Sequence, residues 1–358
     1  MTTGRQAIFW VIALVALSVF LLVFSEILLP FVVGMILAYA VDPIADRFER
    51  LGMSRLWATL TILLLLVVVL VLSLVLLVPI LVNQATDLIE DMPTYVEKLH
   101  GLLTSFLDSG ISEYLGLDLP KVRSYLGGLS SQGASWLATV LASLWSGGRA
   151  FLNILSLLVV APVVAFYLLY DWDRLVARVD TLLPRDHVDE IRAIARDIDS
   201  AIAAFIRGQG MVSLTMAIFY SLGLVLIGLN FGFLIGLVAG LLGFIPFVGA
   251  MIGFVLSFGV ALVQFWPEWP WIIATLMIFG VGQFLESNVL QPRLIGHNVG
   301  LHPVWVMFSL FAFGLLFGFV GIMIAIPAAA AVGVLVRYGL KRYMASPIYR
   351  GGGAQIEK

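Results

Sequence analysis

The stretch GFIPFVG, residues 243–249, lies in the middle of an apolar run that extends from residue 231 to residue 265. Glycine and proline are poor helix formers, and one membrane-spanning helix needs only about 20 apolar residues. The run is therefore too long for a single untilted crossing, and it carries helix breakers at its centre. Irregular backbone is tolerated at membrane depth only where it is buried in protein or lines a wet cavity. The stretch thus predicts an interrupted helix beside a polar path.

The composition agrees with a membrane location. The 358 residues are 61% hydrophobic and 12% charged, with a mean hydropathy of +1.06, whereas soluble proteins carry about 25% charged residues. We expect an all-α, polytopic helical membrane protein in the inner (plasma) membrane, with the lipid bilayer as its surroundings. The net charge of −2 gives no reason to expect nucleic acid as a partner. Cysteine is absent, which excludes disulfides, thiolate metal sites and cysteine nucleophiles.

About eight hydrophobic segments stand out by their length and lack of charge. We expect the first to be a retained helix and not a cleaved signal peptide, because no small-residue cleavage site follows it. Two of the eight are unusually long and are interrupted by glycine or proline. The segments comprise residues 7–24, 27–41, 56–81, 151–170, 211–229, 231–265, 271–290 and 303–336.

Two polar regions interrupt this series. Residues 82–150 have leucines at helical spacing and predict amphipathic helices outside the hydrocarbon. Residues 171–207 predict an amphipathic helix that begins after Pro184. The expected organisation is N-terminal transmembrane helices 1–3 (1–81), an extracytoplasmic helical region (82–150), a fourth span (151–170), a cytoplasmic amphipathic helix (171–207), a C-terminal transmembrane half with the transport site (208–336) and a cytoplasmic tail (337–358).

Basic residues predict the orientation of the chain. The 171–207 region holds six arginines, and Arg337, Lys341 and Arg342 follow the last hydrophobic segment closely. Loops rich in lysine and arginine stay in the cytoplasm. We therefore expect both termini to be cytoplasmic and residues 82–150 to face outward.

The two long runs leave two topologies open. Pro246 and Gly249 mark the predicted break in 231–265. Gly321 and Pro327 mark it in 303–336, which also contains Gly314 and Gly318. Both runs can be re-entrant hairpins, or both can be bent helices that cross the membrane, since proline often only kinks a helix. The positive-inside rule slightly favours hairpins, because they place Arg293 in the cytoplasm.

The most informative polar cluster is Gln283, Glu286 and Asn288, at the end of the 271–290 segment. Gln283 and Glu286 are three residues apart and should share a helix face. A carboxylate at the edge of hydrocarbon usually faces the bundle interior, a partner or an ion path. Glu286 could accept a proton, pair with Arg293, hydrogen-bond a polar solute, or simply be an interfacial, partly solvated carboxylate.

Motifs of soluble catalysis are missing. The sequence has no G-x-x-x-x-G-K-[ST], no H-E-x-x-H and no G-x-S-x-G. We expect no enzyme activity, no ATP-driven transport, no cofactor and no metal site.

Several stretches together resemble the AI-2E family of transporters. They are ILLPFVVGMILAYAVDPI (27–44), FYLLYDWDRL (166–175), IRGQ (206–209), GLLGFIPFVGAMIG (240–253), LESNVLQPRLIGHNVGLHP (285–303) and GLLFGFVGIMIAIPAAA (314–330). The resemblance implies about eight helical segments, transport without ATP hydrolysis and a homo-oligomer, with a pentamer as one option. The family includes exporters of the quorum-sensing signal autoinducer-2, permeases of unknown substrate and sodium/proton antiporters.

The resemblance also implies roles for individual residues. Pro246 and Gly249 would form the helix break, and Glu286 and Asn288 would supply polar contacts. The connecting loop would be shaped by Pro292, Arg293, Gly296 and Pro303.

Three hypotheses about function are consistent with the sequence. The leading hypothesis is a secondary transporter that exports a small polar solute such as autoinducer-2. The alternative is a sodium/proton antiporter with Glu286 as the titrating group. The third is a membrane scaffold that transports nothing, which the paired helix breaks disfavour.

Overall fold

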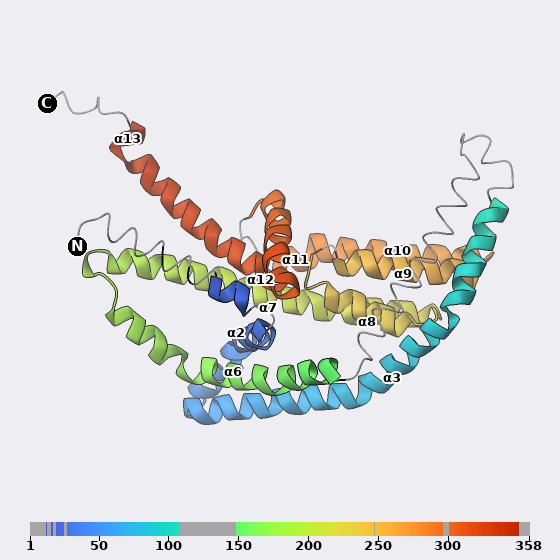
Figure 1. Cartoon of the computed structure of the whole chain (residues 1–358), viewed down its shortest axis with the longest axis horizontal. Helices are drawn as coiled ribbons and strands as arrows, with labels where there is room; N and C mark the ends of the chain where they lie inside the picture. The colour runs from blue at the N-terminus through green and yellow to red at the C-terminus, as the bar shows by residue number, and fades with distance from the viewer. Residues whose placement is uncertain are drawn as a thin grey trace. The chain divides into compact units, whose positions relative to one another are not determined.

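The computed structural model describes residues 27–106, 148–246, 248–295 and 301–350, together with scattered positions between residues 12 and 24 (Figure 1). Within these ranges the chain forms helices and no strands. Seven of the described helices are long and apolar enough to cross a membrane. These findings confirm the prediction of an all-α, polytopic membrane protein. Most of the first predicted span (7–24), residues 107–147 of the predicted polar region 82–150, and Gly296 lie outside the described residues.

The chain divides into two compact units. Unit 1 comprises Met1–Leu65, Ser156–Gly210 and Gln291–Lys358, and unit 2 comprises Leu66–Leu155 and Met211–Leu290. The long helices are α2 (Leu28–Arg50), α3 (Arg55–Phe106), α6 (Gly148–Thr181), α7 (Val188–Leu226), α9 (Val248–Phe265), α10 (Trp269–Leu285) and α12 (Pro303–Ala345). The shorter ones are the 3-10 turn η3 (Arg185–His187), α8 (Gly232–Leu242), the π-helix η4 (Glu286–Leu290), α11 (Gln291–Leu294) and α13 (Pro347–Arg350).

Two helices run through expected domain boundaries. Helix α3 has 52 residues and continues past residue 81, where we expected the membrane segment to end. Helix α7 begins after Pro184 and η3, as predicted, but continues past residue 207 to Leu226. The physical reason is that a change in hydropathy marks the edge of hydrocarbon. It does not by itself end a helix, and α3 continues through Pro79 just as α7 continues through Gly208 and Gly210.

The run 231–265 folds as a helical hairpin made of α8 and α9, which lie side by side in Figure 1. At its open end Gln264 joins the two arms: its Oε1 accepts from the backbone N of Asn230 at 2.7 Å, and its Nε2 donates to the Gly228 carbonyl at 2.7 Å. Helix α8 has 11 residues and is about 16 Å long, shorter than a bilayer core. The run is thus a helix–turn–helix hairpin and not one bent helix, and its re-entrant insertion stays a prediction.

The predicted break at Pro246 and Gly249 coincides with the turn of this hairpin. Helix α8 ends at Leu242, and α9 begins at Val248. A Cβ atom on Gly249 would collide with the carbonyl oxygen of Ala239, so glycine is required where the arms meet. The backbone N–H groups of 243, 244, 245 and 248 all donate to carbonyls within the hairpin. The break therefore does not expose a row of free amide donors.

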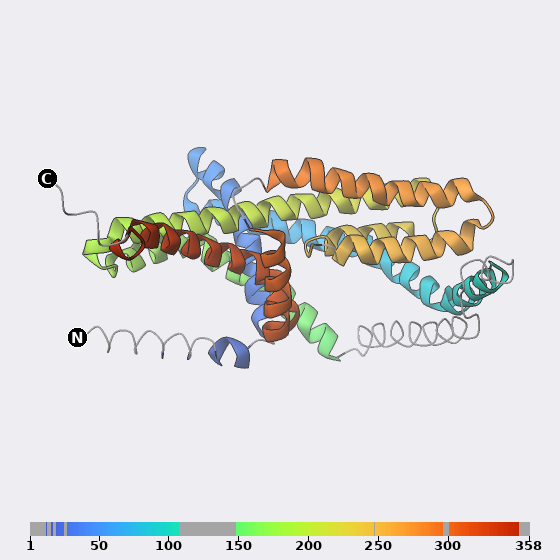
Figure 2. The same ribbon diagram turned by 90° about the horizontal axis from the view of Figure 1, so that it is seen from above.

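The run 303–336 breaks at a different residue from those we expected. Within α12 the one non-helical position is Gly318, with φ 59° and ψ −138°, a conformation that favours glycine. Figure 2 shows the two arms of α12 meeting at a sharp bend. Gly321 lies in the second arm, packed against the Phe313 carbonyl, and Pro327 lies inside the helix. A proline one turn or more into an arm is accommodated without ending it, which explains the displaced break.

Small residues allow α7 and α8 to approach closely. Gly232, Gly236 and Gly240 recur every four residues on one face of α8. They lie against the backbone of α7 at Leu224, Ser221 and Ala217, in that order. The order is antiparallel, and the small residues let the two helix backbones approach closely.

In unit 1, Arg55 joins the first residues of α3 to α2 and α6. Its guanidinium donates to Asp42, Asp46 and Glu49 of α2 at 2.9, 2.9 and 3.1 Å. Its Nε donates to the Leu169 carbonyl of α6 at 2.8 Å. Each carboxylate is partly exposed, so the individual pairs are screened by water. Together they fix the α2–α3 hairpin against α6.

The glycine face predicts a matched pair of stability effects. We expect Gly240→Ala to lower the free energy of unfolding by about 1–3 kcal/mol, because the added methyl group overpacks the contact with Ala217. Gly259→Ala in α9 is the control, since nothing lies within 4 Å of a Cβ there. Thermal unfolding of the purified protein in detergent measures both. Equal effects of the two substitutions would contradict the close α7–α8 packing.

Candidate functional site

Glu286 lies at the first position of the π-helix η4, directly after α10. Its side chain is buried, with 8% of the residue exposed. Single π-helical turns inserted into α-helices occur frequently at functional sites. A buried carboxylate in a membrane helix is costly and marks a proton, ion or solute path by default. The structure therefore places the predicted carboxylate in the interior of unit 2, which argues against the partly solvated alternative.

Tyr220 of α7 is the neighbour that sequence reasoning missed. It is 1% exposed, and its ring stacks on Phe279 of α10, with centroids 4.6 Å apart. The ring covers Gly282: a Cβ atom there would lie 2.7 Å from Tyr220 Oη. Gly282 precedes Glu286 by one helical turn. The absence of a side chain at Gly282 thus makes room for the phenol against the turn of α10 that precedes the carboxylate.

The phenol of Tyr220 is buried without a hydrogen-bond partner among the described residues, and so is the hydroxyl of Ser213. The two residues are seven apart and lie on the same face of α7. Each unsatisfied buried group costs about 1–3 kcal/mol. A carboxylate acceptor and unpartnered hydroxyls buried in one unit are the kinds of group that bind a proton, a small cation or a solute rich in hydroxyl groups.

The other polar residues of the predicted cluster do not join Glu286. Gln283 and Asn288 are exposed, whereas Glu286 is buried. The Asn288 amide donates to the Phe284 carbonyl at 3.1 Å and to Ser287 Oγ at 3.0 Å. The expected shared face of Gln283 and Glu286 is thus not observed. Residues three apart on a helix differ by about 60° in direction, which is enough to separate a buried from an exposed position.

The predicted loop residues are partly described. Pro292 and Arg293 are exposed on α11. Pro303 is the first residue of α12, a favoured place for proline, and the preceding His302 caps the helix by accepting from Val304 N. Gly296 lies outside the described residues. Arg293 belongs to unit 1 and Glu286 to unit 2, so their pairing stays a prediction.

Tyr220 could have been found from one feature of the sequence. It is a tyrosine in the middle of the fifth hydrophobic segment, where an aromatic belt residue is not expected. The contact of Tyr220 with α10 could not be predicted from the sequence, because it depends on how α7 and α10 pack.

The sequence model of the family described as "AI-2E family transporter" matches residues 8–341. The chain belongs to the AI-2E transporter family. It is 31% identical over 345 residues to "Putative permease PerM" of Escherichia coli (strain K12), covering 92% of each chain. It is 28% identical over 330 residues to "Putative transport protein YrrI" of Bacillus subtilis (strain 168), covering 90% of each chain. The protein is thus a multi-pass membrane transporter, as the resemblance predicted.

The unpartnered phenol predicts opposite effects on stability and on transport. We expect Tyr220→Phe to raise the free energy of unfolding by about 1 kcal/mol, because it removes a buried hydroxyl that has no partner, and to lower solute flux. Thermal unfolding and flux into proteoliposomes measure the two effects. Tyr167→Phe, on an exposed position of α6, is the control and should change neither. A loss of stability in Tyr220→Phe would mean that the hydroxyl is satisfied inside the folded protein.

Proposed function

We propose that this AI-2E family member is a secondary transporter that exports a small polar solute such as autoinducer-2. The observation that supports it most is the buried Glu286, one helical turn after the glycine that the unpartnered phenol of Tyr220 covers, inside a unit built from interrupted helices. Groups of this kind are retained inside a membrane protein when they meet a ligand. The solute would supply the hydrogen bonds that the buried hydroxyl lacks.

The charge content of the C-terminal half supports a neutral, hydroxyl-rich solute. Residues 208–336 contain Glu268 and Glu286 as acidic residues and Arg293 as the one basic residue. Glu268 is exposed, so one buried carboxylate faces the site. A carboxylate with phenol and serine hydroxyls suits hydrogen bonds to a sugar-like molecule. A strongly charged solute would need more counter-charges than this site provides.

Transport without ATP hydrolysis follows from the absence of a P-loop in the chain. Export would then be driven by the solute's own gradient or by a coupled ion. We further propose that the protein resides in the inner membrane as a homo-oligomer, with a pentamer as one option, and that both termini are cytoplasmic.

The second candidate is a sodium/proton antiporter. It is favoured by the burial of Glu286, because a buried carboxylate can exchange a proton for a cation. One carboxylate is a small ligand set for sodium, which takes several oxygen ligands. The hydroxyl oxygens of Tyr220 and Ser213 are further oxygens that are buried in the same unit.

The substitution Glu286→Gln separates the two candidates. It removes the titrating group while keeping the size and a hydrogen-bonding oxygen. In proteoliposomes, we expect export of a neutral solute to fall several-fold but to remain measurable, whereas proton-coupled sodium exchange would be abolished. Glu268→Gln is the matched control, since Glu268 is the other, exposed, carboxylate of this half. Wild-type flux of both kinds in Glu286→Gln would contradict a role for this carboxylate in transport.

The orientation is tested by labelling a single cysteine, which the cysteine-free chain makes straightforward. If 231–265 is a re-entrant hairpin that enters from outside, the connection at 266–270 faces outward. A cysteine in place of Trp269 should then react with a membrane-impermeant thiol reagent added to intact cells. A cysteine in place of Arg342, at the cytoplasmic end, should not react. Labelling of the 269 position only after the cells are opened would contradict the hairpin topology.

A further inference from the structure

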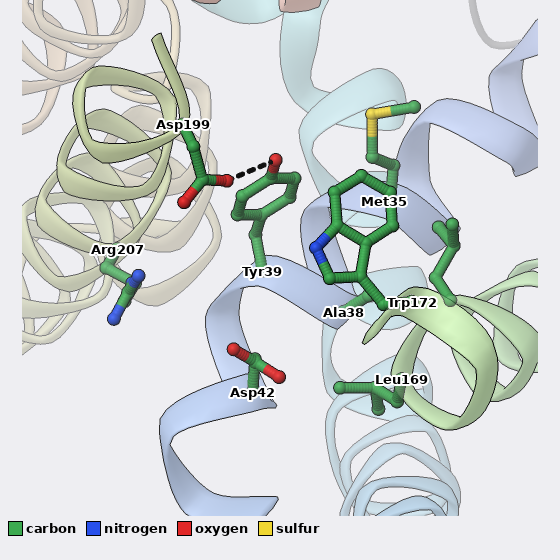
Figure 3. A pocket seen from close by; sticks show the side chains of 9 residues that line it. Met35, Ala38, Tyr39, Asp42, Leu169, Trp172, Asp199 and Arg207 are labelled. Carbon is green, nitrogen blue, oxygen red and sulfur yellow. Dashed lines mark hydrogen bonds between the residues drawn. The ribbon is translucent and has the colours of Figure 1, made fainter. Parts of the chain in front are cut away.

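A separate pocket lies within unit 1, between α2, α6 and α7 (Figure 3). Its volume is about 130 Å³, room for about four water molecules or one small organic ligand. It is open on one side. The walls combine apolar side chains such as Met35 with two aromatic rings, two carboxylates and one arginine. The proposed transport chemistry at Glu286 uses none of these residues.

The pocket carries both signs of charge. Asp199 of α7 accepts a hydrogen bond from Tyr39 Oη of α2 at 2.9 Å. A carboxylate has about four acceptor sites, so this bond leaves Asp199 able to bind a further donor. Asp42 of α2 accepts from Arg55 at 2.9 Å through one of its oxygens. The two carboxylates are thus held in place by the protein and retain acceptor capacity toward the pocket.

Arg207 supplies the positive charge. It lies on α7 eight residues after Asp199, so the two are about 12 Å apart along the helix axis. Among the described residues it forms no ion pair or hydrogen bond. A guanidinium has five N–H donors in a planar fork that suits carboxylate and phosphate groups. Although their backbone positions are separated, the side chains of Asp199 and Arg207 line the same pocket, so one small ligand can meet both.

The aromatic side chains that line the pocket can bind a cation near its carboxylates. The rings of Tyr39 and Trp172 lie 6.3 Å apart at 66°, edge to face. Figure 3 shows the indole of Trp172 beside Tyr39, above Ala38 and Leu169. Faces of tryptophan and tyrosine attract ammonium groups.

We infer that this pocket binds a small zwitterion, with its ammonium group at Asp199 and its anionic group at Arg207, while Asp42 stays paired with Arg55. A plain cation would leave Arg207 as an unfavourable like charge, and a plain anion would meet two carboxylates. A ligand with both charges satisfies every group. Two sources share this chemistry: a free amino acid and the headgroup of phosphatidylethanolamine.

The first test uses the unmodified protein. Purified full-length protein in detergent is titrated with alanine, with phosphoethanolamine, with ethylamine and with acetate, and the unfolding temperature is recorded. A ligand that binds the folded state raises this temperature. We expect a rise with alanine or phosphoethanolamine that neither ethylamine nor acetate reproduces. A rise with alanine identifies the amino-acid source, and a rise with phosphoethanolamine alone identifies the lipid headgroup.

The second test assigns the binding to the pocket. Asp199→Asn and Arg207→Gln each remove one charge that the ligand needs, and each should weaken binding by at least about ten-fold, the loss of one charge-assisted hydrogen bond. Asp197→Asn and Arg196→Gln are the matched controls, exposed on the same helix outside the pocket. Binding of ethylamine as strong as that of alanine, no binding of either zwitterion, or equal loss in the controls would overturn the inference.

Discussion

The structure depends on one constraint, the need to satisfy backbone polar groups in surroundings that contain little water. The hairpin of α8 and α9 meets it without a continuous spanning helix. Its tip bonds its own amide groups, and Gln264 bonds the backbone at its open end. Both sets of hydrogen bonds need closely packed helices, and the glycines of α8 allow this packing against α7. A short helix can therefore lie beside longer ones without leaving unpaired amides.

Because the hairpin bonds backbone groups internally, side chains supply the polar contacts to a ligand in the proposed transport site. The amide donors of the break at residues 243, 244, 245 and 248 are bonded within the hairpin, so we expect contacts to a ligand from side chains. The hydroxyls of Tyr220 and Ser213 are buried without a hydrogen-bond partner among the described residues, and Glu286 is a buried carboxylate of the same unit. Tyr220 packs against Gly282, one helical turn before Glu286. The interrupted helix is then a means of shaping unit 2, and the buried side chains carry the proposed transport site.

Sequence reasoning identified the apolar runs, the break near Pro246 and Glu286 as a candidate carboxylate, because each depends on local composition. It missed the continuation of α3 and α7, since hydropathy reports the edge of hydrocarbon and not the end of a helix. It assigned the second break to Gly321 and Pro327, whereas Gly318 adopts the left-handed conformation. The position of Tyr220 and the contacts of Arg55 depend on packing between segments that are distant in the sequence. Local sequence patterns do not encode such packing.

The central claim is that Glu286 is a buried carboxyl group that the transported solute reaches. A membrane-permeant carbodiimide labels such groups, and mass spectrometry of the purified protein quantifies the labelling at each carboxyl. The account predicts that Glu286 is labelled and that a transported solute or ion protects it, while labelling of the exposed Glu268 is unchanged. Labelling of Glu286 that no transported solute or ion reduces would contradict the account.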